Sequence, residues 1–216
     1  MRAAWGNGMG ERRSRATDGY AENAAALAEQ YERLTFEDVH RDMLALFPVE
    51  PGRVLDVGAG TGRDAAALSA RGHRVTAVEP TRALREHGQR AHARAGIRWI
   101  DDLLPHLAGL GDERACFDLI LLTAVWMHLD ADEREAAMAR VADLVAPGGL
   151  VVMSLRHGPV PEGRRMFAVS AEETEALAGS HGLSPIRRQE REDMLGRSDV
   201  RWTFLALRAA GPRPEP

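Results

Sequence analysis

A glycine-rich turn with a carboxylate beside it is the first feature of this sequence that could do chemistry. The stretch VLDVGAGTGR over residues 54–63 predicts a buried strand that runs into a tight turn. Gly58 and Gly60 let the main chain turn sharply and let a ligand approach it, because they carry no Cβ. Asp56 stands next to that turn, where it would repel a pyrophosphate and attract a cation.

The spelling of this turn differs from two common phosphate-binding motifs. A phosphate-binding loop ends in Gly-Lys-Ser/Thr, which is missing, and a dinucleotide fold needs a third glycine where this sequence has Arg63. A second acidic residue, Glu79, closes the apolar run VTAV, 19 residues after Gly60. That position suits hydrogen bonds to the hydroxyls of a ribose. The two carboxylates therefore favour a positively charged nucleoside that carries no phosphate.

The elements that must position these residues alternate between strand and helix. Strands are predicted at 53–57, 74–79, 97–100, 117–122 and 149–155, with helices at about 62–71, 81–95, 103–110 and 130–146. The strands are nearly continuous apolar runs, as expected when helices cover both faces of a parallel sheet. This alternation predicts a doubly wound α/β sheet.

The C-terminal third breaks the alternation. A helix is predicted from the capping-box sequence at 170–173 to about Gly179, followed by two strands at 183–192 and 201–208. Two strands joined without a helix should form an antiparallel hairpin at the sheet edge. The expected fold is therefore Rossmann-like α/β, with a doubly wound, seven-stranded, mostly parallel sheet, an antiparallel C-terminal hairpin strand and helices on both faces.

Two helices are expected ahead of this sheet. High helix propensity covers residues 20–34, and apolar residues at helical spacing cover 36–47. We expect residues 19–210 to form one domain, with 19–48 as lid helices, and residues 1–18 and 211–216 to be flexible tails.

Composition narrows the classes of partner. The 28 basic and 32 acidic residues leave a formal net charge of −4, so the chain has no overall basic footprint for nucleic acid. Cys116 is the single cysteine, no apolar run is long enough to span a membrane, and the N-terminus lacks a secretory signal pattern. The eight histidines show no metal-ligand spacing. We expect a cytoplasmic monomer or homodimer with a small-molecule substrate, and no metal, nucleic-acid or membrane partner.

Taken together, the motifs make the sequence similar to the class I S-adenosylmethionine-dependent methyltransferases, in particular those that act on small molecules. The resemblance covers about residues 20–208 and is strongest in VLDVGAGTGR, AVEPTRAL, FDLILLTAVWMHL and APGGLVVMSL. It implies S-adenosylmethionine as cofactor and S-adenosylhomocysteine as product. The GTGRDA spelling also resembles methyltransferases of the tellurite and thiopurine type, in which the arginine at the position of Arg63 meets the methionine carboxylate.

The resemblance also implies roles for individual residues. Asp56, Gly58, Ala59 and Gly60 would hold the methionine end, Glu79 the ribose, and Thr123 would lie under the methionine moiety. Either Asp101 or Asp102, with Asp102 favoured, would accept from the adenine amino group. The other cofactor-binding candidates are Tyr20, Pro80, Leu84 and Leu103.

Candidates for the acceptor side follow the fourth and fifth strands. His128 is a candidate general base, with His157 as a second catalytic candidate, against the ordinary alternative of packed or solvated histidines. Candidate substrate-binding residues are Trp126, Met127, Arg156, Arg164 and Tyr31. The basic loop with Arg156 and Arg164 suggests an acidic substrate, against the alternative of solvated charge.

The expected reaction is direct methyl transfer from the sulfonium to an oxygen or nitrogen of a small organic molecule. Alignment of the reacting groups and exclusion of water would supply most of the catalysis, and a base is needed only for a protonated acceptor. Four alternatives stay open: cyclisation or cleavage of the sulfonium compound, methylation of RNA, a nicotinamide oxidoreductase and a binding protein without catalysis.

Overall fold

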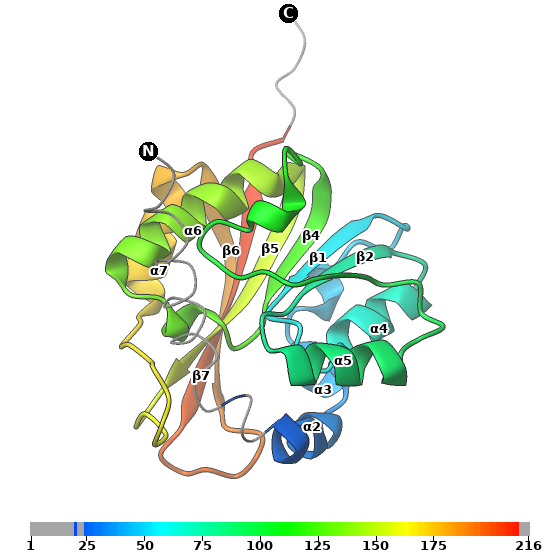
Figure 1. Cartoon of the computed structure of the whole chain (residues 1–216). Coiled ribbons are helices and arrows are strands. Elements are labelled where there is room, and N and C mark those ends of the chain that lie inside the picture. Colours follow the sequence, from blue (N-terminus) through cyan, green and yellow to red (C-terminus); the bar gives the residue numbers. More distant parts are fainter. Residues whose placement is uncertain (1–19, 21–23, 212–216) are drawn as a thin grey trace, which may run out of the picture.

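A computed structural model describes residue 20 and residues 24–211, and a seven-stranded sheet lies at the centre of this part of the chain (Figure 1). The strand order is β3-β2-β1-β4-β5-β7-β6. The bounds are β1 (Arg53–Val57), β2 (Arg74–Val78), β3 (Arg98–Ile100), β4 (Phe117–Leu122), β5 (Val145–His157), β6 (Leu183–Glu192) and β7 (Arg201–Ala209). Strands β1 to β5 pair in parallel, and β7 runs antiparallel between β5 and β6. The predicted fold class is confirmed.

Strand β1 lies where the strand order changes direction. It pairs with β2 on one side and β4 on the other, and Asp56 stands opposite Ala77 of β2 and Leu121 of β4. In open α/β sheets a ligand crevice forms outside the carboxyl ends of the strands at such a point. The register therefore brings the end of β1, with its glycine turn, to the centre of that edge.

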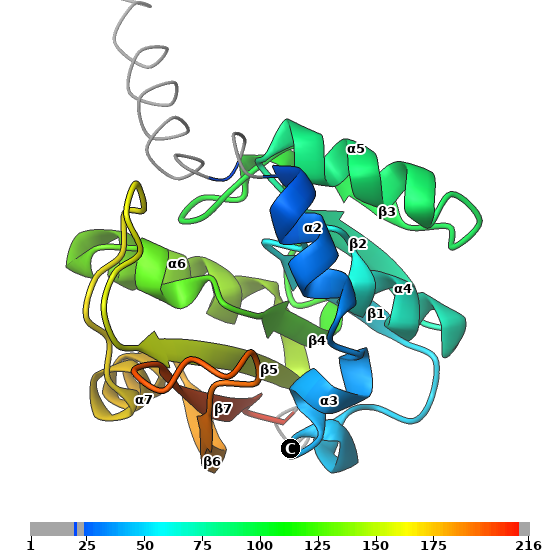
Figure 2. The same ribbon diagram turned by 90° about the horizontal axis from the view of Figure 1, so that it is seen from below.

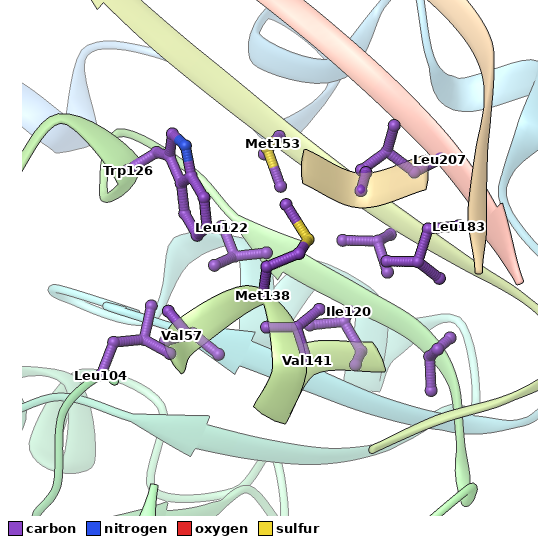
Figure 3. Packing of buried hydrophobic residues seen from close by; sticks show 14 of the residues in the cluster. Val57, Leu104, Ile120, Leu122, Trp126, Met138, Val141, Met153, Leu183 and Leu207 are labelled. Carbon is purple, nitrogen blue, oxygen red and sulfur yellow. The ribbon is translucent and has the colours of Figure 1, made fainter. Parts of the chain in front are cut away.

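Helices cover both faces of the sheet. Their bounds are α2 (Ala24–Glu32), α3 (Phe36–His40), α4 (Arg63–Ala70), α5 (Arg82–Ala91), α6 (Ala131–Leu144) and α7 (Ala171–Ser180). Alternate residues of β4 serve the two faces, as side chains of a strand do. Ile120 packs in the core that contains Met138 of α6 (Figure 3), whereas Leu119 packs in the core that contains Leu68 of α4.

Several elements differ from the sequence prediction. The helix expected over 103–110 is wrong: the structure has turns there and a 3-10 helix, Ala108–Leu110. Pro105 lacks an N–H and disfavours helical geometry in the residue before it, and the Asp102 carboxylate takes the Gly109 N–H. The α-helix expected over 36–47 ends at His40 and a 3-10 helix, Leu44–Leu46, follows. Strand β5 begins four residues earlier than predicted, at Val145.

Segments far apart in the sequence surround the carboxyl edge of the sheet. Figures 1 and 2 show α2, the connection between β5 and α7, and the loop between β6 and β7 around that edge. The tail predicted at 1–18 lies outside the described residues, and so do residues 212–216 of the tail predicted at 211–216. No helix in the described part of the chain has the length and apolar character needed to cross a membrane.

Candidate active site

A pocket of about 440 Å³ opens at the carboxyl edge of the sheet. Its volume lies in the range typical of small-molecule sites. The strand ends, α2, the β5–α7 connection and the β6–β7 loop all contribute to its wall. Most of the predicted site residues line it: Tyr20, Tyr31, Asp56, Gly58, Ala59, Gly60, Arg63, Glu79, Pro80, Leu84, Asp102, Leu103, Thr123, Met127, His128, Arg156 and Arg164.

The glycine turn has a conformation that other residues rarely adopt. Gly58 and Gly60 have φ of +69° and +57°, in the left-handed region. A Cβ on Gly58 would stand 2.5 Å from Cγ2 of Val125. The N–H groups of Gly58 and Ala59 both donate to the carbonyl of Val78, at 2.8 and 3.0 Å. The end of β2 therefore fixes the turn that follows β1.

Glu79 ties this turn to the start of α5. Its Oε2 accepts from the Gly60 N–H at 2.8 Å, and its Oε1 accepts from the Thr81 N–H at 2.7 Å. Burial raises the pKa of the Glu79 carboxyl, while the two backbone N–H groups act in the opposite direction. The Glu79 carboxylate thus lies at the pocket wall, and each of its oxygens accepts a hydrogen bond from a backbone N–H group.

Asp56 has an oxygen that the described residues do not satisfy. The side chain is buried and lines the pocket, yet its Oδ2 has no hydrogen-bond partner within the described part of the chain. Burial, together with the nearby carboxylates of Asp64 and Glu79, raises the pKa of Asp56 well above its usual value. A cationic group in the pocket would relieve both the desolvation and the repulsion.

Asp64 is a site residue that sequence reasoning missed. It is buried at the start of α4, where its carboxylate accepts from Nε of Arg63 at 2.7 Å and Oγ1 of Thr123 at 3.2 Å. Its Oδ2 also lies 2.8 Å from Nε2 of His40. Burial alone would raise the pKa of Asp64, but His40 and Arg63 outweigh it and lower that pKa. Asp64 could have been found from the sequence, because it is the last residue of the motif GTGRD, whereas nothing in the sequence pointed to His40.

Tyr20 and His128 form a polar pair that also lines the pocket. Nδ1 of His128 lies 2.8 Å from the carbonyl oxygen of Arg165, and Nε2 lies 2.9 Å from the Tyr20 hydroxyl. Because a carbonyl only accepts, Nδ1 carries the proton, and Nε2 of the neutral ring accepts from Tyr20. Burial, with the nearby arginines Arg164, Arg165 and Arg156, lowers the pKa of His128 and favours that neutral ring.

Comparison with known proteins decides the family. Residues 54–149, from β1 into β5, match the family model described as "Methyltransferase domain". This segment of the chain is thus a methyltransferase domain. The matched segment contains the glycine turn, Glu79, Asp102, Thr123 and His128.

Two curated relatives and one solved structure illustrate the likeness. An uncharacterized methyltransferase of Mycobacterium tuberculosis (strain ATCC 25618 / H37Rv) is 34% identical over 131 residues, which are 56% of this chain and 63% of that protein. The ubiquinone biosynthesis O-methyltransferase of Methylocella silvestris is 37% identical over 117 residues, 53% of this chain and 44% of that protein. The chain therefore spans less than two thirds of the length of these relatives.

The solved structure shares the fold. It is the 1,6-didemethyltoxoflavin-N1-methyltransferase of Burkholderia thailandensis, with bound 1,6-didemethyltoxoflavin and S-adenosylhomocysteine. Its TM-score is 0.72 at 20% identity, over 97% of this chain and 92% of that chain. At this identity the likeness concerns the fold of the methyltransferase domain and not its substrate.

The two aspartates that follow β3 have different surroundings. Asp102 lines the pocket, and its oxygens accept from the N–H groups of Leu103 and Gly109 at 2.8 and 2.6 Å. Asp101 forms an ion pair with Arg85 at 2.9 Å and does not line the pocket. Of the two predicted alternatives, the structure brings only Asp102 to the site.

Two of the predicted residues do not reach the pocket. Trp126 is fully buried and belongs to the core beneath it, where Figure 3 shows the indole beside Leu122. It is therefore a packing residue and not a platform for substrate. His157, at the end of β5, lies 2.8 Å from the Thr203 hydroxyl of β7 and is absent from the pocket wall. Its side chain faces the neighbouring strand, so the structure does not bring this second catalytic candidate to the pocket.

The loop between β6 and β7 adds a wall that the sequence did not indicate. Asp193 accepts from Nε1 of Trp202 at 2.9 Å and from NH2 of Arg197 at 2.7 Å, and all three residues line the pocket. Burial opposes the effect, but these donors lower the pKa of Asp193. The loop lies more than 60 residues beyond Thr123 in the sequence, and the antiparallel pairing of β7 with β5 brings it to the site.

Proposed function

We propose that this methyltransferase domain binds S-adenosylmethionine and transfers its methyl group to an oxygen or nitrogen of a small organic acceptor. The observation that carries the proposal is the buried Asp56 carboxylate, whose Oδ2 is unsatisfied within the described residues beside the glycine turn. A sulfonium compound with an ammonium group would supply a cationic partner for this carboxylate. The family match and the fold support the same cofactor.

Residues of the glycine-turn end fit the parts of this cofactor. Asp56 and the turn would hold the ammonium end, and Glu79 would accept from the ribose hydroxyls. Asp102 would accept from the adenine amino group, between apolar walls that include Leu84, Pro80 and Leu103. Arg63, fixed by Asp64 at 2.7 Å, would meet the methionine carboxylate. When bound, the cofactor supplies an electrophilic methyl group on a positively charged sulfur.

The Tyr20–His128 pair would supply the base for an acceptor that must lose a proton. The acceptor O–H or N–H would donate to the Tyr20 oxygen, while the Tyr20 hydroxyl proton moves to Nε2 of His128. The ring would then be an imidazolium, with its Nδ1–H still held by the carbonyl of Arg165. This transfer needs a neutral His128, which burial favours by lowering the pKa of the ring.

The first experiment separates cofactor binding from chemistry. Calorimetry with S-adenosylhomocysteine tests binding, and a panel of small acceptors with methyl-labelled S-adenosylmethionine tests transfer. Release of S-adenosylhomocysteine supports methylation, whereas release of methylthioadenosine would indicate cyclisation or cleavage of the cofactor. Labelling of tRNA in place of small acceptors would contradict the proposed substrate class.

A second experiment tests the base. We expect Tyr20→Phe and His128→Asn each to lower kcat by about 10² to 10⁴, the usual contribution of a general base, with little change in the Kd for S-adenosylhomocysteine. His181→Asn is the matched control, because His181 pairs with Glu135 on the exposed surface. A flat pH profile of kcat in the wild type, together with normal kcat in both variants, would remove the base from the mechanism.

A further inference from the structure

Charge is divided between the two ends of the pocket. The carboxylates of Asp56, Glu79 and Asp102 lie at the ends of β1, β2 and β3. The opposite wall contains four arginines, from the end of β5, from the β5–α7 connection and from the β6–β7 loop: Arg156, Arg164, Arg165 and Arg197. The acidic end suits the cationic cofactor, so the arginines need a different explanation.

Two of these arginines already have carboxylate partners. Arg165 forms ion pairs with Asp130 and Glu133, both at 2.8 Å. Arg197 forms a pair of hydrogen bonds with Asp193, at 3.0 and 2.7 Å. Both guanidinium groups are neutralised within the protein, and they hold the loops of the pocket wall in place.

Arg156 and Arg164 differ from them, because neither forms an ion pair with a carboxylate of the described residues. Arg156 is 9% exposed, and its NH1 donates to the carbonyl oxygen of Pro159 at 2.8 Å. The guanidinium of Arg164 lies 3.7 Å from the centre of the Tyr20 ring. A carbonyl and an aromatic face hold these two guanidinium groups in position without placing a carboxylate in direct contact with them.

The two guanidinium groups line the same pocket as Tyr20 and His128. Both lie close enough to Tyr20 to lower the pKa of its hydroxyl, although burial outweighs them and raises it. Both also lower the pKa of His128, in addition to the larger effect of burial. The two unpaired positive charges therefore stand beside the polar pair at which the acceptor would react.

We propose that the methyl acceptor carries an anionic group, a carboxylate or a phosphate monoester, that binds to Arg156 and Arg164. This inference rests on the proposed function, since it concerns the second substrate of the same pocket. An arginine fork presents two parallel N–H groups to the oxygens of such an anion. Met166, Trp202 and Phe204 extend the same wall with apolar and aromatic surface, which suits an apolar body on the acceptor.

The test uses simple anions as probes of the full chain saturated with S-adenosylhomocysteine. Benzoate and phenyl phosphate represent the two anionic groups, and benzamide is the neutral analogue. We expect calorimetry to detect at least one of the two anions and no binding of benzamide. The comparison of benzoate with phenyl phosphate then identifies the preferred anion.

Variants locate the binding groups. Arg156→Gln and Arg164→Gln should each weaken anion binding at least about tenfold, as expected for a lost charge-assisted hydrogen bond. Arg164→Lys, which keeps the charge and loses the planar stack on Tyr20, should be intermediate and controls for a folding defect. Arg114→Gln should bind as the wild type does, because Arg114 pairs with Asp143 at an exposed position outside the pocket.

Three outcomes would overturn this inference. The first is a wild type that binds S-adenosylhomocysteine but neither anion. The second is a loss of S-adenosylhomocysteine affinity in Arg164→Gln that matches its loss of anion affinity, which would assign the guanidinium to the methionine carboxylate. The third is unchanged anion binding in both glutamine variants. Failure of the wild type to bind S-adenosylhomocysteine would instead refute the proposed function. Cofactor binding and anion binding are measured separately, so the two failures can be distinguished.

Discussion

At one end of the pocket the polar side chains stand at strand ends, whereas at the other end most of them come from the connections between elements. Asp56 lies within β1, and Glu79 directly follows β2, with both of its oxygens held by backbone N–H groups. Arg164 and Arg165 lie in the connection between β5 and α7, and Arg197 lies in the β6–β7 loop. The two ends therefore differ in charge and in how they are built.

The difference shows which part of the pocket the fold itself determines. The register of parallel strands places residues at neighbouring strand ends wherever this sheet forms. Connections contain few groups fixed by strand pairing, and they depend on side-chain contacts such as the ion pairs of Arg165. We infer that the strand-end half is suited to a cofactor common to the family and that the loop-built half is suited to a particular acceptor.

The largest effect is expected from Glu79→Ala, which breaks the strand-end half. The substitution leaves the N–H groups of Gly60 and Thr81 without their carboxylate and removes the acceptor proposed for the ribose. We expect S-adenosylhomocysteine to bind roughly 100-fold to 1,000-fold more weakly, as measured by calorimetry. Glu190→Ala, at an exposed position of β6, is the control. Near-normal affinity in Glu79→Ala would remove the distinction between the two ends.

Trp126→Leu tests whether the indole is a core residue beneath the loop-built half of the pocket or part of the pocket surface. Because Trp126 is fully buried in the core, we expect a loss of about 2 kcal/mol in the free energy of unfolding, measured with urea. Affinity for benzoate or phenyl phosphate should change little in the folded variant. A large loss of probe affinity without loss of stability would return Trp126 to the pocket surface.

A smaller effect concerns the proton on Asp56. Its pKa is raised in the free protein by burial and by the carboxylates of Asp64 and Glu79, and a bound cation would lower it. Binding should therefore release a proton, and affinity for S-adenosylmethionine should rise with pH by at most about tenfold per pH unit. Calorimetry in buffers with different ionisation enthalpies measures that proton. Asp56→Asn should remove the buffer dependence, and an unchanged dependence in this variant would assign the proton elsewhere.

The smallest effect is a pH dependence of stability from His128. Burial lowers the pKa of His128 in the folded protein below 6.5, the ordinary value that applies in the unfolded chain. Between the folded and the unfolded pKa, the unfolded chain therefore binds more protons than the folded protein does. The contribution of the neutral ring is thus complete above pH 6.5 and is lost as the pH falls through that window. Urea unfolding at pH 7 and pH 5 should show a larger loss for the wild type than for His128→Asn. Equal losses would place His128 in a solvated environment.

The sequence by itself determined the sheet and the strand-end half of the pocket. Apolar runs of strand length alternate with helical patterns, and this local signal predicts a parallel sheet without knowledge of any contact. Once the sheet is predicted, Asp56, the glycine turn and Glu79 follow, because carboxyl ends of parallel strands meet at one edge. Local chemistry also explains why the helix predicted over 103–110 is wrong, because Pro105 disfavours an α-helix at that place.

Only the tertiary structure decided the loop-built half. Its groups meet across long sequence separations: Tyr20 with His128, and the β6–β7 loop with the glycine-turn edge. No periodicity or motif encodes such meetings, because they depend on how the connections pack against the finished sheet. The same packing decided that Trp126 lies in the core, that His157 faces Thr203, and that two of the four wall arginines lack a carboxylate within the described residues.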